Sequence, residues 1–158
     1  MIIREIQSKD NFQMGTIVQQ VLMEMGAPKI GTAYSDPNLF SLYETYNFPK
    51  SIYYVIENDN KIIGGAGIAI LDNDENITCE LQKMYFLQEC RGLGFGTQIM
   101  NLCLKKAVAF GYKQCYLETM SYMIDAQKLY KKVGFEYINA PLGNTGHTSC
   151  PVWMLKNL

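Results

Sequence analysis

The 158-residue sequence has almost no excess of charge of either sign and no long apolar run. Fourteen Lys and Arg residues stand against fifteen Asp and Glu residues, for a formal net charge of -1. A chain with interspersed charges has neither the basic surface that binds nucleic acid nor a polybasic membrane patch. No apolar run approaches the ~18 residues of a membrane span, and the N-terminus lacks the regions of a signal peptide. We therefore expect a cytoplasmic protein without nucleic-acid or membrane partners.

Metal and disulfide patterns are also scarce. The five cysteines are odd in number and contain no Cys-x-x-Cys pair, so reduced thiols are expected. His147 is the single histidine, and with Cys150 it lacks a second pair of ligands at zinc-site spacing. We interpret the two as a loop histidine beside a small thiol. The acidic segment 72–76 matches a calcium loop only at its first three alternate positions, and we interpret it as a hairpin turn. No metal is expected.

Apolar periodicity and turn residues predict strands and helices along the whole chain. Strands are expected at 2–6, 51–57, 61–71, 78–87, 113–120 and 150–155, with one more after the last helix. The second and third enclose a turn at Asn58-Asp59-Asn60, and three glycines, Gly64, Gly65 and Gly67, should weaken the third. Helices are expected from Ser8 or Asp10 to Met25, from a cap at Ser35-Asp36-Pro37 to Tyr46, over 97–109, and up to Gly134.

This order of elements mixes hairpins with β-α-β crossovers. It predicts one α/β domain spanning 1–158, with a mixed sheet of about seven strands covered by helices on both faces. The sequence shows no linker, repeat or low-complexity segment.

The most informative segment is Gln-Glu-Cys-Arg-Gly-Leu-Gly-Phe-Gly at 88–96, between an apolar strand and a helix. A glycine-rich arch at the start of a helix presents backbone N–H groups to an anion such as a pyrophosphate. A P-loop is excluded because Thr97 follows Gly96 without a lysine. A dinucleotide fingerprint fits poorly, although Glu118 lies near the distance expected of a ribose-binding acid, so this alternative stays open.

Three motifs in order resemble one known family. Residues 91–96 fit the (Gln/Arg)-x-x-Gly-x-(Gly/Ala) motif of the GNAT family, the GCN5-related N-acetyltransferases. Residues 80–86 resemble the fourth strand of that fold, and 126–135 resemble its A-x-x-L-Y-x-x-x-G-F segment. The resemblance covers roughly residues 62 to 138 and implies acetyl-coenzyme A as the cofactor, lying between splayed strands 78–87 and 113–120. It implies two sets of cofactor contacts: pantetheine on the backbone of Met84, Tyr85 and Phe86, and pyrophosphate on Arg91, Gly92, Leu93, Gly94, Phe95, Gly96 and Thr97.

The resemblance also implies a reaction, in which an acetyl group moves to a primary amine by direct attack through a tetrahedral intermediate. Tyr130 stands where the family has its general acid, and a backbone N–H near Phe86 is the expected oxyanion donor. Glu80 and Glu118 each stand where one branch of the family has a general base. We favour Glu80, and base catalysis through water without an essential carboxylate stays open.

Two features limit the resemblance. Met123 occupies a position where the family commonly has an asparagine that binds the coenzyme, so that contact is in doubt. Residues 26–48 and the loop 143–147 are expected to face each other around the acceptor. They carry no strong charge pattern, although Asp36 and Glu44 could attract a cationic amine. A small amine, an amino acid and a peptide N-terminus all stay open as acceptors, and so does a homodimer. The alternative function is a non-catalytic acetyl-coenzyme A sensor.

Overall fold

The computed structural model describes residues 1–72 and 77–158, which form a seven-stranded mixed sheet in the order β1-β2-β3-β4-β5-β7-β6. The β4–β5 pair is parallel and the other neighbours are antiparallel. The strands are β1 Ile2–Glu5, β2 Ile52–Asn58, β3 Lys61–Ile70, β4 Thr78–Phe86, β5 Gln114–Thr119, β6 Glu136–Ile138 and β7 Val152–Asn157. The predicted α/β fold with a mixed sheet is confirmed. Most of the acidic segment 72–76 lies outside the described residues.

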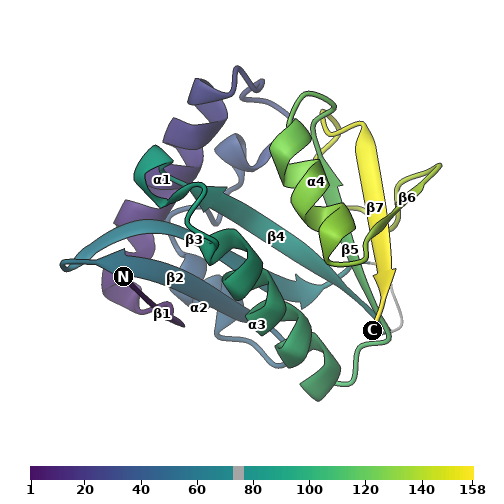
Figure 1. Ribbon diagram of the computed structural model, residues 1–158, viewed down its shortest axis with the longest axis horizontal. Helices are drawn as coiled ribbons and strands as arrows, with labels where there is room; N and C mark the ends of the chain where they lie inside the picture. The colour runs from purple at the N-terminus through teal and green to yellow at the C-terminus, as the bar shows by residue number, and fades with distance from the viewer. Residues whose placement is uncertain (73–76) are drawn as a thin grey trace.

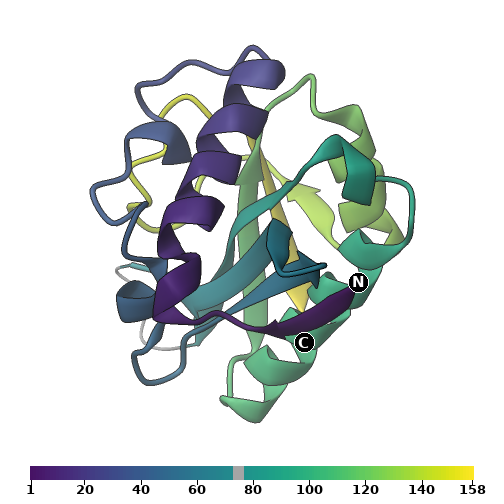
Figure 2. The same cartoon turned by 90° about the vertical axis from the view of Figure 1, so that its left-hand side faces the viewer.

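Helices cover both faces of this sheet (Figures 1 and 2). One face carries α1 Asn11–Glu24 and α2 Leu42–Tyr46, and the other carries α3 Phe95–Ala109 and α4 Ile124–Lys132. Two apolar cores result, one under α1 around Met14 and Val18, and one under α3 around Ile99 and Cys103. None of the helices in the described ranges combines the length and the apolar character that a membrane crossing needs.

The β2–β3 hairpin confirms the predicted turn. Asp59 and Asn60 both have positive φ, 48° and 62°, which Asn and Asp tolerate better than most residues. The glycines of β3 lie at two irregularities of the strand, as expected: the register against β2 shifts next to Gly64, and the register against β4 shifts between Gly65 and Gly67. They also have a packing role. A Cβ at Gly64 would collide with the ring of Phe86, and a Cβ at Gly67 with the ring of Tyr53. The rings of Phe86 and Tyr53, from the two neighbouring strands, therefore pack directly against the backbone of β3.

Strands β4 and β5 separate along their length, as predicted. They pair only at Thr78↔Gln114, Cys79↔Cys115 and Glu80↔Tyr116, although β4 continues to Phe86. A register shift against β3 accompanies the separation, and Lys83 there has a φ of 49°, a left-handed conformation that is unfavourable for lysine. The hydroxyl of Tyr53 donates to the carbonyl of Lys83 at 2.7 Å and holds this bulge in place.

The second helix is shorter than predicted. Asp36 does not cap a helix: its ψ is 129°, the preceding residues Ala33–Ser35 form one 3-10 turn, and α2 begins only at Leu42. The carboxylate of Asp36 instead binds Lys83 and His147, which are distant in the sequence. Two other boundaries move by two residues, because α3 begins at Phe95 and the last strand runs over Val152–Asn157.

Candidate active site

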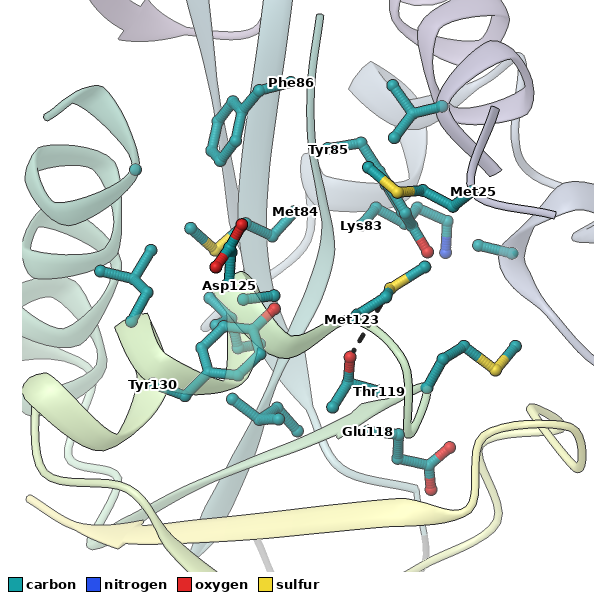
Figure 3. Close-up of a pocket in the computed structure, with 18 of the residues that line it drawn as sticks. Met25, Lys83, Met84, Tyr85, Phe86, Glu118, Thr119, Met123, Asp125 and Tyr130 are labelled. Atoms are coloured by element: carbon teal, nitrogen blue, oxygen red, sulfur yellow. Dashed lines mark hydrogen bonds between the residues drawn. The ribbon is translucent and has the colours of Figure 1, made fainter. Parts of the chain in front are cut away.

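A cavity of about 610 Å³ lies where β4 and β5 separate (Figure 3). Side chains from both strands, the glycine arch, α4 and the loop before β7 line it. The structure brings together eleven of the thirteen predicted site residues at this cavity: Glu80, Met84, Tyr85, Phe86, Arg91, Gly92, Gly94, Gly96, Thr97, Glu118 and Tyr130. The other two differ, since the Leu93 side chain is exposed and Phe95 packs against the core under α3.

The glycine arch has the geometry of an anion site. Gly92 and Gly94 have φ of 77° and 83°, and a Cβ on either would meet no atom within 4 Å, so the space beside this backbone is open. Gly94 is the N-cap of α3, whose 15 residues direct the positive end of the helix dipole towards the arch. Gly96 has a packing role, since a Cβ there would lie 3.1 Å from the side chain of Leu129. The arch therefore fits a pyrophosphate.

Arg91 lies at the edge of the cavity but is held by protein groups. Its Nε donates to the carbonyl of Phe86 at 2.9 Å, and its two terminal nitrogens donate to Glu24 at 2.6 and 3.1 Å. Arg91 thus joins the end of β4, the arch and the last residue of α1. The guanidinium group must break its hydrogen bonds with Glu24 before both of its terminal nitrogens can donate to a phosphate.

Glu80 is almost fully buried, and its carboxylate is held by a short hydrogen-bond chain. Gln82 Nε2 donates to Glu80 Oε2 at 2.6 Å, and the hydroxyl of Tyr46 donates to Gln82 Oε1 at 2.7 Å. Burial raises the pKa of Glu80 to about 7, and the hydrogen bond from Gln82 offsets part of that rise. A carboxyl with this pKa is suited to accept a proton near neutral pH.

Glu118 is held differently. Tyr116 Oη donates to its Oε1 at 2.6 Å, and Thr145 Oγ1 donates to its Oε2 at 2.9 Å. Both oxygens therefore accept hydrogen bonds from protein groups, one of them in the loop before β7. This arrangement anchors the loop and leaves less of the carboxylate for a substrate.

Tyr130 extends from α4 towards the middle of the cavity, on the same side of β4 as Met84 and Phe86 (Figure 3). Its ring packs edge-on against Phe135, with centroids 6.1 Å apart. Burial raises the pKa of Tyr130 to about 12, so the phenol keeps its proton at neutral pH. Met123 also lines the cavity, and its sulfur accepts from Thr119 Oγ1 at 3.7 Å.

Sequence reasoning missed a charged cluster on the other side of β4. Lys83 Nζ lies 2.6 Å from Asp36 Oδ2, and His147 Nε2 lies 3.1 Å from Asp36 Oδ1. We call these three residues the Asp36 cluster. His147 therefore does more than occupy a loop beside Cys150, although both residues do line the cavity. Only the predicted meeting of 26–48 with the loop 143–147 hinted at this, and it is confirmed by the contact between His147 Nε2 and Asp36 Oδ1 itself.

Burial and charge act against each other within the Asp36 cluster. Burial alone would lower the pKa of His147, but the hydrogen bond and charge of Asp36 outweigh it and raise that pKa above its usual value. Burial alone would raise the pKa of Asp36, but His147 and Lys83 together lower it. Within 1–72 and 77–158, no group of three or more His, Cys, Asp or Glu side chains is arranged to hold a metal ion.

Comparison with known proteins gives consistent matches. A family model described as "Acetyltransferase (GNAT) family" matches residues 20–135. The chain is 41% identical over 159 residues to the uncharacterized N-acetyltransferase YjgM of Escherichia coli (strain K12), covering 99% of this chain and 95% of that protein.

Solved structures share the fold at lower identity. A GNAT-family acetyltransferase from Staphylococcus aureus Mu50 superposes with a TM-score of 0.86 at 21% identity, covering 99% of this chain and 98% of that one. The Salmonella typhimurium protein yncA, solved with its cofactor acetyl-CoA, superposes with a TM-score of 0.79 at 16% identity, covering 99% and 93%.

Proposed function

The chain belongs to the GNAT family of acetyltransferases, and from that premise we propose that it transfers an acetyl group from acetyl-coenzyme A to a primary amine by direct attack of the amine. Its enzyme class is acyltransferase, and its cofactor is acetyl-coenzyme A. We further propose that residues 1–158 act as a single N-acetyltransferase domain.

One observation carries the proposal: Glu80, Tyr130 and the glycine arch line the same cavity. An acetyl transfer to an amine needs a base for the amine, a proton for the departing thiolate and a site for the coenzyme phosphates. These groups come from β4, α4 and the start of α3, and the separation of β4 from β5 is what admits a ligand between them. A cavity that only stored a nucleotide would not need the buried carboxyl and the buried phenol together.

The residues present fit the cofactor. The arch at Gly92 and Gly94, with open space beside its backbone, would hold the pyrophosphate. Beyond Glu80, β4 has no pairing with β5, so the backbone groups of β4 that point to that edge, such as those of Met84, would bind the amides of the pantetheine arm as an added strand would. Tyr85 is instead paired with Gly65 of β3. The carbonyl of Phe86 already accepts a hydrogen bond from Arg91. We therefore assign only the backbone N–H of Phe86 to a contact with the cofactor.

Each catalytic step can be assigned to a group of this chain. Acetyl-coenzyme A supplies the activated acetyl group when bound. Glu80 accepts a proton from the ammonium form of the acceptor and so generates the nucleophilic amine. The N–H of Phe86 donates to the oxygen that gains negative charge. Tyr130 donates its phenolic proton to the departing sulfur, which requires a phenol that is protonated at neutral pH.

The environment favours Glu80 over Glu118 as the base. Glu80 has a pKa of about 7, because burial disfavours its charged form. Glu118 accepts hydrogen bonds at both oxygens and acts in our proposal as the anchor of the loop before β7. Catalysis through water would leave either carboxylate dispensable, and substitution distinguishes these cases.

The test is an assay of coenzyme thiol release against a library of amines, amino acids and peptides. With an acceptor in hand, Tyr130→Phe should lower kcat by about 10²- to 10⁴-fold, the usual contribution of general acid catalysis, and leave acetyl-coenzyme A affinity nearly unchanged. Wild-type turnover in that variant would reject Tyr130 as the acid. Tight cofactor binding without any acceptor in the library would instead favour a sensor.

A further inference from the structure

The cavity has two chemically different sides, divided by β4. Met84 and Phe86 point to the side of α3 and α4, where Tyr130 and the glycine arch lie, and Lys83 and Tyr85 point to the side of α1 (Figure 3). The cofactor contacts of the proposed function use the first side. The Asp36 cluster lies on the second side, which that function leaves to the acceptor.

A distortion of β4 places Lys83 on this second side. In a regular strand, Gln82 and Lys83 would point to opposite faces. Here Gln82 binds Tyr46 of α2 while Lys83 binds Asp36 of the loop before α2, so both face the α1 and α2 layer. The register shift and the left-handed φ of 49° at Lys83 produce this arrangement. The left-handed backbone conformation is strained for a lysine, and residues with strained backbones are concentrated at functional sites.

The Asp36 cluster contains two basic side chains and only one acidic side chain. One carboxylate is shared between two basic side chains, and the lysine side chain is only 9% exposed. An ammonium group has three donors, and the contact with Asp36 uses one of them. The hydrogen bond and charge of Asp36 favour the charged form of His147. When His147 is protonated, the three side chains together have a net charge of +1.

Glu80 gives the same cavity a negative end. Glu80, Lys83 and His147 line the same cavity. The charges of Lys83 and His147 lower the pKa of Glu80 against the effect of burial, while the charge of Glu118 raises it. The acceptor side of the cavity thus contains a proton-accepting carboxylate near a pair of cationic donors. A simple cationic amine would complement only the first, and it would be repelled by the second.

We propose that Lys83 and His147, held on Asp36, bind the carboxylate of the acceptor, and that the acceptor is a small molecule with both an amine and a carboxylate, such as an amino acid. This assignment rests on the proposed function, because it places the acceptor's amine at Glu80. Asp36 is a positioning residue in this arrangement. Its two oxygens hold the basic groups in place, and it makes no contact with the acceptor.

Matched acceptors test this assignment. Thiol release would be measured for the common amino acids, and for the best of them the methyl ester and the decarboxylated amine would be compared at equal pH. A charge-assisted pair in a buried site should favour the free acid over its ester by roughly 10- to 100-fold in kcat/KM. The variants Lys83→Met and His147→Gln should each reduce that acid-to-ester ratio by about the same factor.

Controls separate recognition from folding. Lys128→Met removes an exposed lysine of α4, whose side chain is 72% exposed, and should leave the acid-to-ester ratio at its wild-type value. Thermal unfolding and acetyl-coenzyme A affinity show whether each variant is folded. If Lys83→Met does not fold because Lys83 supports the bulge, the ratio in His147→Gln decides the question.

Three results would overturn the assignment alone, and a fourth would count against both proposals. A wild-type enzyme that uses the ester or the decarboxylated amine as well as the acid has no carboxylate site, and its thiol release would still support the proposed function. An unchanged acid-to-ester ratio in both folded variants would place recognition elsewhere. A preference for peptides whose N-terminal residue has no nearby carboxylate counts against the assignment in the same way. No thiol release with any acceptor counts against both proposals.

Discussion

The surroundings of Glu80 determine its strength as a base. Its carboxylate is buried next to the unpaired part of β4, and it is oriented by Gln82, which Tyr46 holds in turn. Burial makes this carboxyl a stronger base than an exposed one, and the same burial costs folding free energy. Both effects can be measured.

We expect the pH profile of kcat/KM to show the ionisation of Glu80. A base works only when deprotonated, so kcat/KM should rise with pH through about 7, where Glu80 titrates. Glu80→Gln should lower kcat/KM by about 10²- to 10⁴-fold and abolish that rise. The matched variant Glu118→Gln should keep the rise. If Glu118→Gln removes it while Glu80→Gln does not, the assignment of the base is reversed.

The same residue should affect stability in a pH-dependent way. Folding raises the pKa of Glu80 from 4.5 to about 7. Its contribution to the free energy of unfolding is therefore lowest at a pH where Glu80 is ionised in both the folded and the unfolded state. Stability relative to a neutral side chain is therefore highest below pH ~4.5 and is lost as the pH rises through about 7. Glu80→Gln should be more stable than wild type at pH 8, by at most roughly 3 kcal/mol, and about equally stable at pH 4.

Urea unfolding of the two proteins at both pH values checks this expectation. Glu136→Gln, which changes an exposed carboxylate of β6, controls for the substitution itself. A Glu80→Gln variant less stable than wild type at pH 8 would show that the hydrogen bond from Gln82 outweighs the cost of burial.

At the scale of elements, the two ends of α3 offer a matched comparison. Gly94 at its start and Gly111 after its end have φ of 83° and 87°, and a Cβ on either would meet no atom within 4 Å. Either substitution by Glu should cost roughly 1–2 kcal/mol, because a side chain disfavours the left-handed conformation. Only Gly94→Glu also puts a carboxylate where we propose that the pyrophosphate binds.

Calorimetric titration with acetyl-coenzyme A should therefore show no binding to Gly94→Glu and near-normal binding to Gly111→Glu. Normal binding to a folded Gly94→Glu protein would mean that the phosphates bind elsewhere. The pair of variants isolates phosphate binding from backbone strain, since the strain is shared by both positions.

The β4 bulge shows how one local distortion contributes to the geometry of the cavity. It follows the end of the pairing with β5, which leaves backbone free on one edge, and it turns Lys83 to the α1 side of the sheet, where Lys83 binds Asp36. The Tyr53 hydroxyl stabilises the distortion through the Lys83 carbonyl. The missing Cβ of Gly67 makes room for the Tyr53 ring, so the glycines of β3 contribute to the geometry of the cavity.

For the molecule as a whole, the cofactor should act as a stabilising ligand. It would contact β4, the arch and α4 together, so a ligand that binds only the folded state should raise the midpoint of thermal unfolding. At about 100 times its dissociation constant, such a ligand adds roughly 2.7 kcal/mol. We expect acetyl-coenzyme A to raise Tm by several degrees and NAD to leave it unchanged. Equal stabilisation by NAD would support the dinucleotide alternative for the glycine arch.

The order of elements, the glycine arch and the tyrosine of α4 could all be read from the sequence, because each depends on residues close together in the chain. Spaced glycines between a strand and a helix define an anion site locally, and helical periodicity places Tyr130 relative to Gly134. The cofactor followed from these short motifs and from the family resemblance that they carry.

What only the tertiary structure decided depends on contacts between distant segments. Asp36, Lys83 and His147 are separated by 47 or more residues, and no local pattern indicates that they share one carboxylate. The same contacts explain why the predicted helix at Asp36 is wrong: the carboxylate expected to cap that helix binds Lys83 and His147 instead. Burial likewise distinguishes Glu80 from Glu118, which have the same side chain and differ only in what the fold packs around them.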